Sequence, residues 1–276
     1  MIAALVIVFR EVFEAALIVG IVLAATRGVT ARERWVAGGI AAGAVGAGIV
    51  AAFAGTIAGA LEGVGQEVFN AAILFTAVAM LGWHNVWMSR HGRELAAQMS
   101  AVGRQVSSGA QPPYALAVVM GLAVLREGSE VVLFMYGLAA GGATRAGMLA
   151  GGLGGIAGGA AVGVLLYRGL LRVPTRHLFS VTSWMILLLA AGMASQGAFF
   201  LAQAGYLPDP APLWDSSRLL SQKSLPGQAL HALVGYSDRP TAIQLAFYLA
   251  TLLGIGACMK VLGGPPPAPA PARAAA

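Results

Sequence analysis

Seven long apolar runs restrict this sequence to a single class of fold. They cover residues 1–25, 35–61, 67–88, 113–140, 146–167, 178–203 and 241–262. Each run is close to the ~20 residues that an α-helix needs to cross a bilayer. None alternates polar and apolar residues over a sustained length, as a half-buried strand would. The sequence therefore predicts an all-α integral membrane protein with seven transmembrane helices.

The overall composition agrees with a location in the bilayer. Hydrophobic residues make up 58% of the chain and charged residues 10%, whereas soluble domains carry about 25% charged residues. The net charge of +6 is typical of basic cytoplasmic loops, so no nucleic-acid partner is predicted. Cys258 is the one cysteine, which excludes an internal disulfide. We expect one membrane domain over residues 1–262 and a disordered Pro/Ala tail over 263–276.

Basic residues are distributed unevenly between the two sides of the predicted helices. Eleven Lys and Arg residues lie on one side, in segments 26–34, 89–112, 168–177 and from Lys260 to the C-terminus. Four lie on the other side, in segments 62–66, 141–145 and 204–240. The positive-inside rule then places the N-terminus outside and the C-terminus in the cytoplasm. Segment 204–240 becomes an outer loop of a multi-pass protein of the cytoplasmic (inner) membrane.

The first six predicted helices form two similar halves, residues 1–88 and 113–203. The second helix has small residues at every fourth position from Gly39 to Gly59, and the fifth has glycines from Gly147 to Gly163. Such stripes let helix backbones approach closely. Because each half crosses the membrane three times, the halves would have opposite orientations. The sequence thus predicts a 3+3 inverted-topology repeat plus one extra helix, an arrangement in which transporters bind substrate near the midplane.

Charged residues interrupt two of the apolar runs near their middles. Residues 10–14 are Arg-Glu-Val-Phe-Glu, and residues 126–130 are Arg-Glu-Gly-Ser-Glu. Each charge at the centre of a membrane helix costs roughly 2.5–3.5 kcal/mol on insertion scales. In a helix, the two glutamates of each motif share a face and the arginine lies i, i+4 from the second glutamate. Each motif keeps one negative charge, which favours binding of a cation or protons over a purely structural pair of salt bridges.

Carboxylates are hard ligands, suited to Mg²⁺, Ca²⁺, Mn²⁺ and iron. Glu62 and Glu67, at the outer start of the third predicted helix, are candidates for an entrance or are simply solvated. His84, late in the same helix, is a candidate ligand or proton relay, or a hydrogen-bonded histidine between helices. Trp87 lies near the helix end, which is typical of an interfacial aromatic belt.

The pair of R-E-x-x-E motifs resembles the oxidase-dependent iron transporter family, in which R-E-G-L-E occurs twice. That family includes the fungal high-affinity iron permease and the bacterial Efe-type iron permease, and the resemblance covers residues 1–262. It implies import of iron across the cytoplasmic membrane by a permease that is not an enzyme and has no prosthetic group. The alternative is a permease for another divalent cation, lead or manganese. The implied iron ligands are Glu11, Glu14, Glu127 and Glu130, with Arg10 and Arg126 as their partners.

Three features depart from the family pattern. Val12-Phe13 replaces Gly-Leu in the first motif, which is expected to remove a site of close backbone approach, and Ser129 replaces Leu in the second. Segment 204–240 lacks the paired-Glu acidic motif of the fungal members. This favours a separate periplasmic iron-delivery protein as partner over direct transfer from an oxidase. A membrane-embedded hydrolase is disfavoured, because the four histidines are scattered and not spaced as H-E-x-x-H.

Overall fold

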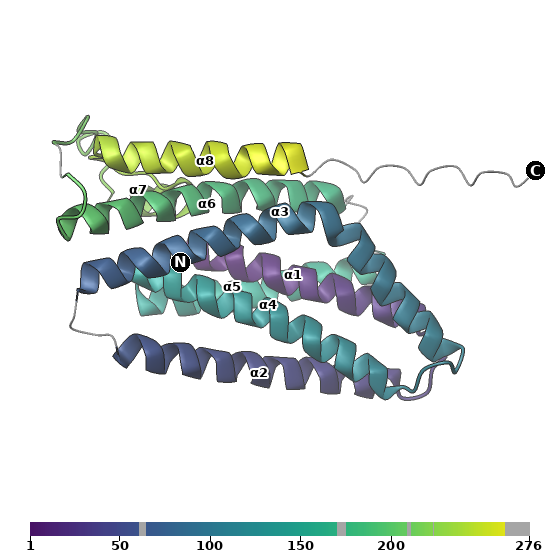
Figure 1. Cartoon of the computed structure of the whole chain (residues 1–276). Helices are drawn as coiled ribbons and strands as arrows, with labels where there is room; N and C mark the ends of the chain where they lie inside the picture. The colour runs from purple at the N-terminus through teal and green to yellow at the C-terminus, as the bar shows by residue number, and fades with distance from the viewer. Residues whose placement is uncertain (61–64, 170–174, 209–210, 223, 263–276) are drawn as a thin grey trace, which may run out of the picture.

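The computed structural model describes residues 1–60, 65–169, 175–208, 211–222 and 224–262 (Figure 1). These residues form helices and no strand. The helices are α1 (Ile2–Ala25), α2 (Arg32–Ala60), α3 (Gln66–Ser107), α4 (Tyr114–Ala140), α5 (Arg145–Tyr167), α6 (Thr175–Gln203), α7 (Leu225–Val234) and α8 (Ala242–Leu262). Glu62 and the tail 263–276 lie outside the described residues, so the predictions made for them stay predictions.

Within the described residues, five helices contain stretches long and apolar enough to cross a membrane: α2, α3, α5, α6 and α8. The prediction of an all-helical membrane protein is therefore confirmed. α1 and α4 have similar lengths, 24 and 27 residues, but each carries the three charged residues of its motif. α1 and α4 cross the membrane only if these charges are accommodated inside the bilayer. The predicted total of seven membrane-spanning helices therefore stays a prediction.

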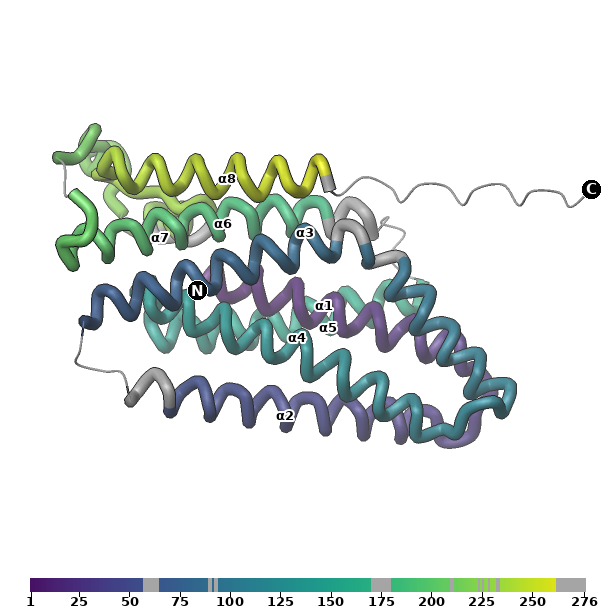
Figure 2. The backbone as a smooth tube through the Cα atoms, viewed as in Figure 1, coloured from purple at the N-terminus to yellow at the C-terminus, as the bar shows by residue number. Residues whose placement is uncertain are grey.

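Two pairs of parallel helices pack closely along their glycine stripes. α1 lies along α5, and α2 lies along α4 (Figure 2). A Cβ atom added at Gly43 of α2 would lie 2.6 Å from the carbonyl oxygen of Gly121 in α4. One added at Gly155 of α5 would lie 2.7 Å from the backbone nitrogen of Phe9 in α1. Larger residues cannot be accommodated at these distances, so the glycines set the separation of the helices.

The main hydrophobic core lies among α1, α3, α4 and α6. Its fully buried side chains include Ile7, Leu74, Phe134 and Ile186, one from each helix. Tight burial of apolar side chains from four helices fixes their relative rotation, because interior packing tolerates few voids. The core therefore holds the two charged motifs of α1 and α4 in a defined position relative to α3.

The helix α3 is much longer than the apolar run that predicts it. Residues 89–112 were expected to be a loop, which is wrong, because the helix continues to Ser107. The extension stays helical because Leu95, Met99 and Val106 pack into a second hydrophobic cluster with α1, α2 and α4. In Figure 1 this part of α3 runs beside the ends of those helices. An amphipathic helix thus replaces the loop that polarity alone suggested.

The segment 204–240 between α6 and α8 is folded in its described part. The short helix α7 is capped at its N-terminus by Ser224, whose hydroxyl accepts a bond from the Gly227 N–H, and is followed by Gly235 with φ 68°. A Cβ added at Gly192 of α6 would lie 2.6 Å from the Cα of Gly235. The Tyr236 hydroxyl donates to the Leu220 carbonyl at 2.7 Å. These contacts hold the segment against α6, and α7 also touches α1.

Candidate metal site

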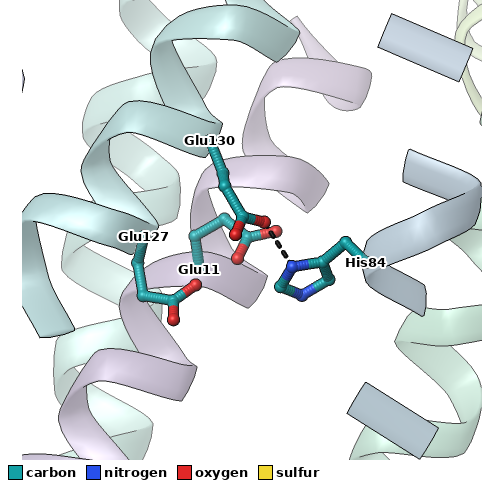
Figure 3. Close-up of side chains that lie close together, drawn as sticks. All are labelled: Glu11, His84, Glu127 and Glu130. Carbon is teal, nitrogen blue, oxygen red and sulfur yellow. Dashed lines mark ion pairs between the residues drawn. The ribbon is translucent and has the colours of Figure 1, made fainter. Parts of the chain in front are cut away.

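Glutamates of the two motifs face one another where α1 contacts α4. The i, i+3 spacing places both glutamates of a motif on one side of its helix. Oxygen atoms of Glu11, Glu127 and Glu130 belong to a group of potential ligand atoms that all lie within 4.8 Å of one another. Figure 3 shows these carboxylates converging from the two helices. Three of the four predicted ligands are thus brought together.

The fourth member of this group is His84, which comes from α3. Its side chain is buried, with 3% of the residue exposed. Its Nδ1 contacts Oε2 of Glu130 (Figure 3), and its Nε2 lies 3.6 Å from Oε2 of Glu14. We call Glu11, His84, Glu127 and Glu130 the metal cluster. It offers three oxygen donors and one nitrogen donor from three different helices.

Arg10 and Glu14 form a buried pair beside the metal cluster. Arg10 Nε lies 2.9 Å from Glu14 Oε1, and Arg10 Nη1 lies 3.6 Å from Glu11 Oε1. The side chains of all three residues are at most 2% exposed. A buried ion pair contributes little net stability, but removal of one partner leaves an uncompensated charge and is strongly destabilising. The side chains of Glu11 and Glu14 are therefore held in place by their contacts with Arg10.

Arg126, the arginine of the second motif, occupies a different environment. Its Nε lies 3.3 Å from Glu130 Oε1 and 3.8 Å from Glu127 Oε1. The guanidinium also stacks over the Trp87 ring, 4.4 Å from its centroid. The side chain is 37% exposed. Trp87 therefore contacts the second motif, which the aromatic-belt interpretation missed, because that contact depends on how α3 packs on α4.

Many polar atoms of this region lack a hydrogen bond of good geometry among the described residues, although several of them belong to the ion pairs described above. They include both oxygens of Glu11 and Glu14, one each of Glu127 and Glu130, and both ring nitrogens of His84. Buried polar groups are nearly always hydrogen-bonded, and leaving their hydrogen-bonding capacity unfilled is costly. Oxygen and nitrogen atoms that face one another without such bonds fit a site for a cation or for shared protons.

The variable positions of the two motifs contact different helices. Gly128 of the second motif faces α2, where an added Cβ would lie 2.6 Å from Ala47 Cβ. Val12 occupies the same place in the first motif and faces Gly159 of α5. A Cβ added at Gly159 would lie 3.0 Å from Val12 Cβ. The expectation that Val12 removes a close approach of helix backbones is therefore wrong. The close approach remains because Gly159 of α5 supplies the small residue that the first motif lacks. Ser129 donates to the Leu125 carbonyl in its own helix at 2.7 Å.

Two further polar residues of α3 lie away from the metal cluster or support it. Glu67 is exposed at the start of α3, and its role at an entrance stays a prediction. Asn85, next to His84, donates to the Ser183 carbonyl of α6 at 3.1 Å. That bond fixes α3 against α6, and with it the position from which His84 reaches the carboxylates.

An apolar cavity of about 620 Å³ lies between α1, α2, α4 and α5. Glu11 and Glu127 are the acidic residues in its wall. The cavity therefore borders two members of the metal cluster, on the side formed by the glycine-striped helices.

In segment 204–240, Asp215 forms an exposed network. Its Oδ1 accepts bonds from the hydroxyl and the backbone N–H of Ser217 at 2.6 and 2.9 Å, and its Oδ2 lies 2.9 Å from Arg239 Nη2. The Ser217 bonds, and then Arg239, lower the pKa of Asp215 from 3.8 to about 2. This carboxylate is charged at neutral pH but already has its own partners.

Comparison with known proteins identifies the chain's relatives. Residues 1–263 match the family model described as "Iron permease FTR1 family". The chain is 31% identical over 256 residues to the ferrous iron permease EfeU of Escherichia coli O6:H1 (strain CFT073), covering 90% of this chain and 91% of that protein. It is 30% identical over 260 residues to EfeU of Yersinia pestis, covering 90% and 89%. No solved structure matches it. The chain therefore belongs to the iron permease FTR1 family, whose members are membrane permeases and not enzymes.

Proposed function

We propose that this protein imports iron as Fe²⁺, with both R-E-x-x-E motifs contributing to one binding site. The observation that carries the proposal is the buried convergence of Glu11, Glu127 and Glu130 with His84 within 4.8 Å. Relatives at 30–31% identity bear the name ferrous iron permease, which favours the ferrous ion. Glu14, the fourth motif glutamate, completes the site from beside the metal cluster.

The charge balance of the two motifs suits a divalent cation. With all groups ionised, four glutamates and two arginines leave two negative charges in a buried site. Such a charge is expensive in low dielectric unless a cation neutralises it. Arg10 holds Glu14, and Arg126 holds Oε1 of Glu130. Glu11, Glu127 and the second oxygen of Glu130 then bind the transported ion.

We further propose that α1 and α4 cross the membrane with the five apolar helices, as parts of an inverted repeat. The support is the exchange of helices between halves: α5 packs along α1, and α2 along α4, with glycine stripes on both. In such repeats, substrate binds at the interface near the midplane. The loop charges favour an outside N-terminus in a cytoplasmic membrane. Segment 204–240 would then face the periplasm, where an iron-delivery or oxidase protein has access.

Reporter fusions test this topology. A reporter active only in the periplasm should work when fused after residue 220 and stay silent when fused at residue 100 or at the C-terminus. The reverse pattern would contradict the orientation and, with it, import as the direction of transport.

Transport itself is tested in proteoliposomes that contain the purified protein. Radiolabelled Fe²⁺, kept reduced without oxygen, should accumulate, and Mn²⁺ or Pb²⁺ should compete weakly. Glu127→Gln keeps the size and removes the charge, so it should abolish most uptake. The matched control is Glu33→Gln, since Glu33 is 82% exposed, and uptake should be unchanged. Uptake of Mn²⁺ or Pb²⁺ in preference to iron would contradict the proposed substrate.

A further inference from the structure

We infer that His84 is a direct ligand of the transported ion and that Glu14 is the residue that orients it. This assignment rests on the proposed function and changes its ligand set. The motifs supply three ligands, Glu11, Glu127 and Glu130, and the fourth comes from α3, outside either motif. The sequence pattern alone suggests four glutamates.

The position of the His84 ring supports a ligand role. The residue is 3% exposed, and its Nδ1 faces Oε2 of Glu130 in the metal cluster (Figure 3). Neither ring nitrogen has a hydrogen bond of good geometry among the described residues. An ion bound by both Nδ1 and the Glu130 oxygen would separate these two side chains and replace their contact with two ligand bonds.

The surroundings of Glu14 fit an orienting role better than a ligand role. One of its oxygens, Oε1, is 2.9 Å from Arg10 Nε. The other, Oε2, is 3.6 Å from Nε2 of His84. A histidine that binds metal through one ring nitrogen usually donates the N–H of the other to a carboxylate, which fixes ring orientation and tautomer. Arg10, Glu14 and His84 lie in the order that such a chain requires, with His84 at the metal cluster.

A nitrogen ligand would affect which ions the site accepts. Magnesium and calcium prefer sites of oxygen alone, whereas imidazole suits iron and other transition metals. Three carboxylates would attract any of these ions. His84 is thus the residue that favours Fe²⁺ over Mg²⁺.

Pulsed electron paramagnetic resonance of Mn²⁺ bound to the purified protein tests the ligand directly. The full chain should show coupling of Mn²⁺ to ¹⁴N, which changes to ¹⁵N coupling when the protein is made with ¹⁵N-labelled histidine. The coupling should disappear in His84→Gln and persist in His91→Gln, the matched control two turns along α3. Bound Mn²⁺ without histidine coupling, or coupling that survives in His84→Gln, would overturn the inference. The labelled wild-type protein gives an answer even if His84→Gln fails to fold.

Metal affinity tests the specificity and the role of Glu14. His84→Gln should lose at least about tenfold in Fe²⁺ affinity, as supporting residues of metal sites typically cost 10–100-fold, with little change for Mg²⁺. Glu14→Gln should keep the nitrogen coupling while losing affinity in that same range. An equal loss for both ions in His84→Gln, or unchanged affinity in Glu14→Gln, would contradict these roles. If Glu127→Gln transports and binds iron normally, the proposed function fails first; if only the histidine results fail, the carboxylate site stands without His84.

Discussion

The two R-E-x-x-E motifs have the same charged residues but different surroundings. Arg10 is 1% exposed and lies between Glu11 and Glu14, whereas Arg126 is 37% exposed and stacks on Trp87. α1 and α4 run in opposite directions (Figure 2), so the two motifs meet the metal cluster with opposite chain directions. Two motifs with the same charged residues can therefore have different roles. The arginine of the first motif is fully buried, whereas that of the second is partly exposed.

The helices next to each motif differ in a complementary way. Val12 meets Gly159 of α5, while Gly128 meets Ala47 of α2. In each pair a glycine allows the close approach. In the first pair the glycine belongs to α5, the neighbour of the motif helix, and in the second it belongs to the motif helix α4 itself. The interfaces are thus alike in spacing although the motif sequences differ, which explains how Val12-Phe13 is accommodated.

The arginines give the largest expected difference between the motifs. Arg10→Ala leaves buried glutamates without their cation and should destabilise the protein by about 3–5 kcal/mol. Arg126→Ala should cost about 1–2 kcal/mol, since a partly exposed ion pair and a cation–π contact are each worth up to about 1 kcal/mol. Thermal unfolding in detergent measures both. Equal losses would show that the difference in burial has no energetic consequence.

Lysine substitutions refine this comparison. Arg10→Lys keeps the charge but not the planar fork of donors, so it should impair iron uptake less than Arg10→Ala. Uptake by proteoliposomes, corrected for the amount of folded protein, gives the measure. A lysine variant as inactive as the alanine variant would show that the geometry of the guanidinium, and not its charge, is essential.

An exchange of side chains between α2 and α4 tests the complementary interfaces. Gly128→Val should clash with Ala47 and cost about 1–3 kcal/mol, as overpacking does. Adding Ala47→Gly copies the arrangement of the first motif and should recover most of that loss. Ala47→Gly alone is the control and should cost no more than about 1 kcal/mol, from lower helix propensity. Strictly additive losses in the double variant would contradict the compensation.

The exposed pair Asp215–Arg239 should have the smallest effect and provides a baseline. Its side chains are 50% and 59% exposed, and such pairs contribute little. The folded pKa of Asp215 is about 2, below the usual 3.8. Any stabilisation is thus fully present above about pH 4 and is lost as pH falls toward 2. Asp215→Asn should leave iron uptake within about twofold of wild type at pH 7; a larger loss would place Asp215 on the transport path.

Much of this arrangement could be predicted from the sequence, because helix length, glycine stripes and the i, i+3 spacing are local properties. They predict the helices and the shared face of Glu127 and Glu130. The position of His84 beside the carboxylates and the stacking of Trp87 on Arg126 depend on how α3 packs against α1 and α4. No spacing within one helix reports such contacts. The extension of α3 was missed for a similar reason, since other helices bury Val106 and partly bury Leu95.

The central claim is that both motifs build a single site, and the stoichiometry of bound Fe²⁺ tests it most directly. Purified protein, titrated without oxygen, should bind a single ion per chain. Glu11→Gln and Glu127→Gln should each remove that binding, because each motif supplies part of the ligand set, while Glu33→Gln should retain it. Two ions bound by the wild-type chain, with one remaining in each variant, would show that the motifs bind ions independently and would contradict the shared site.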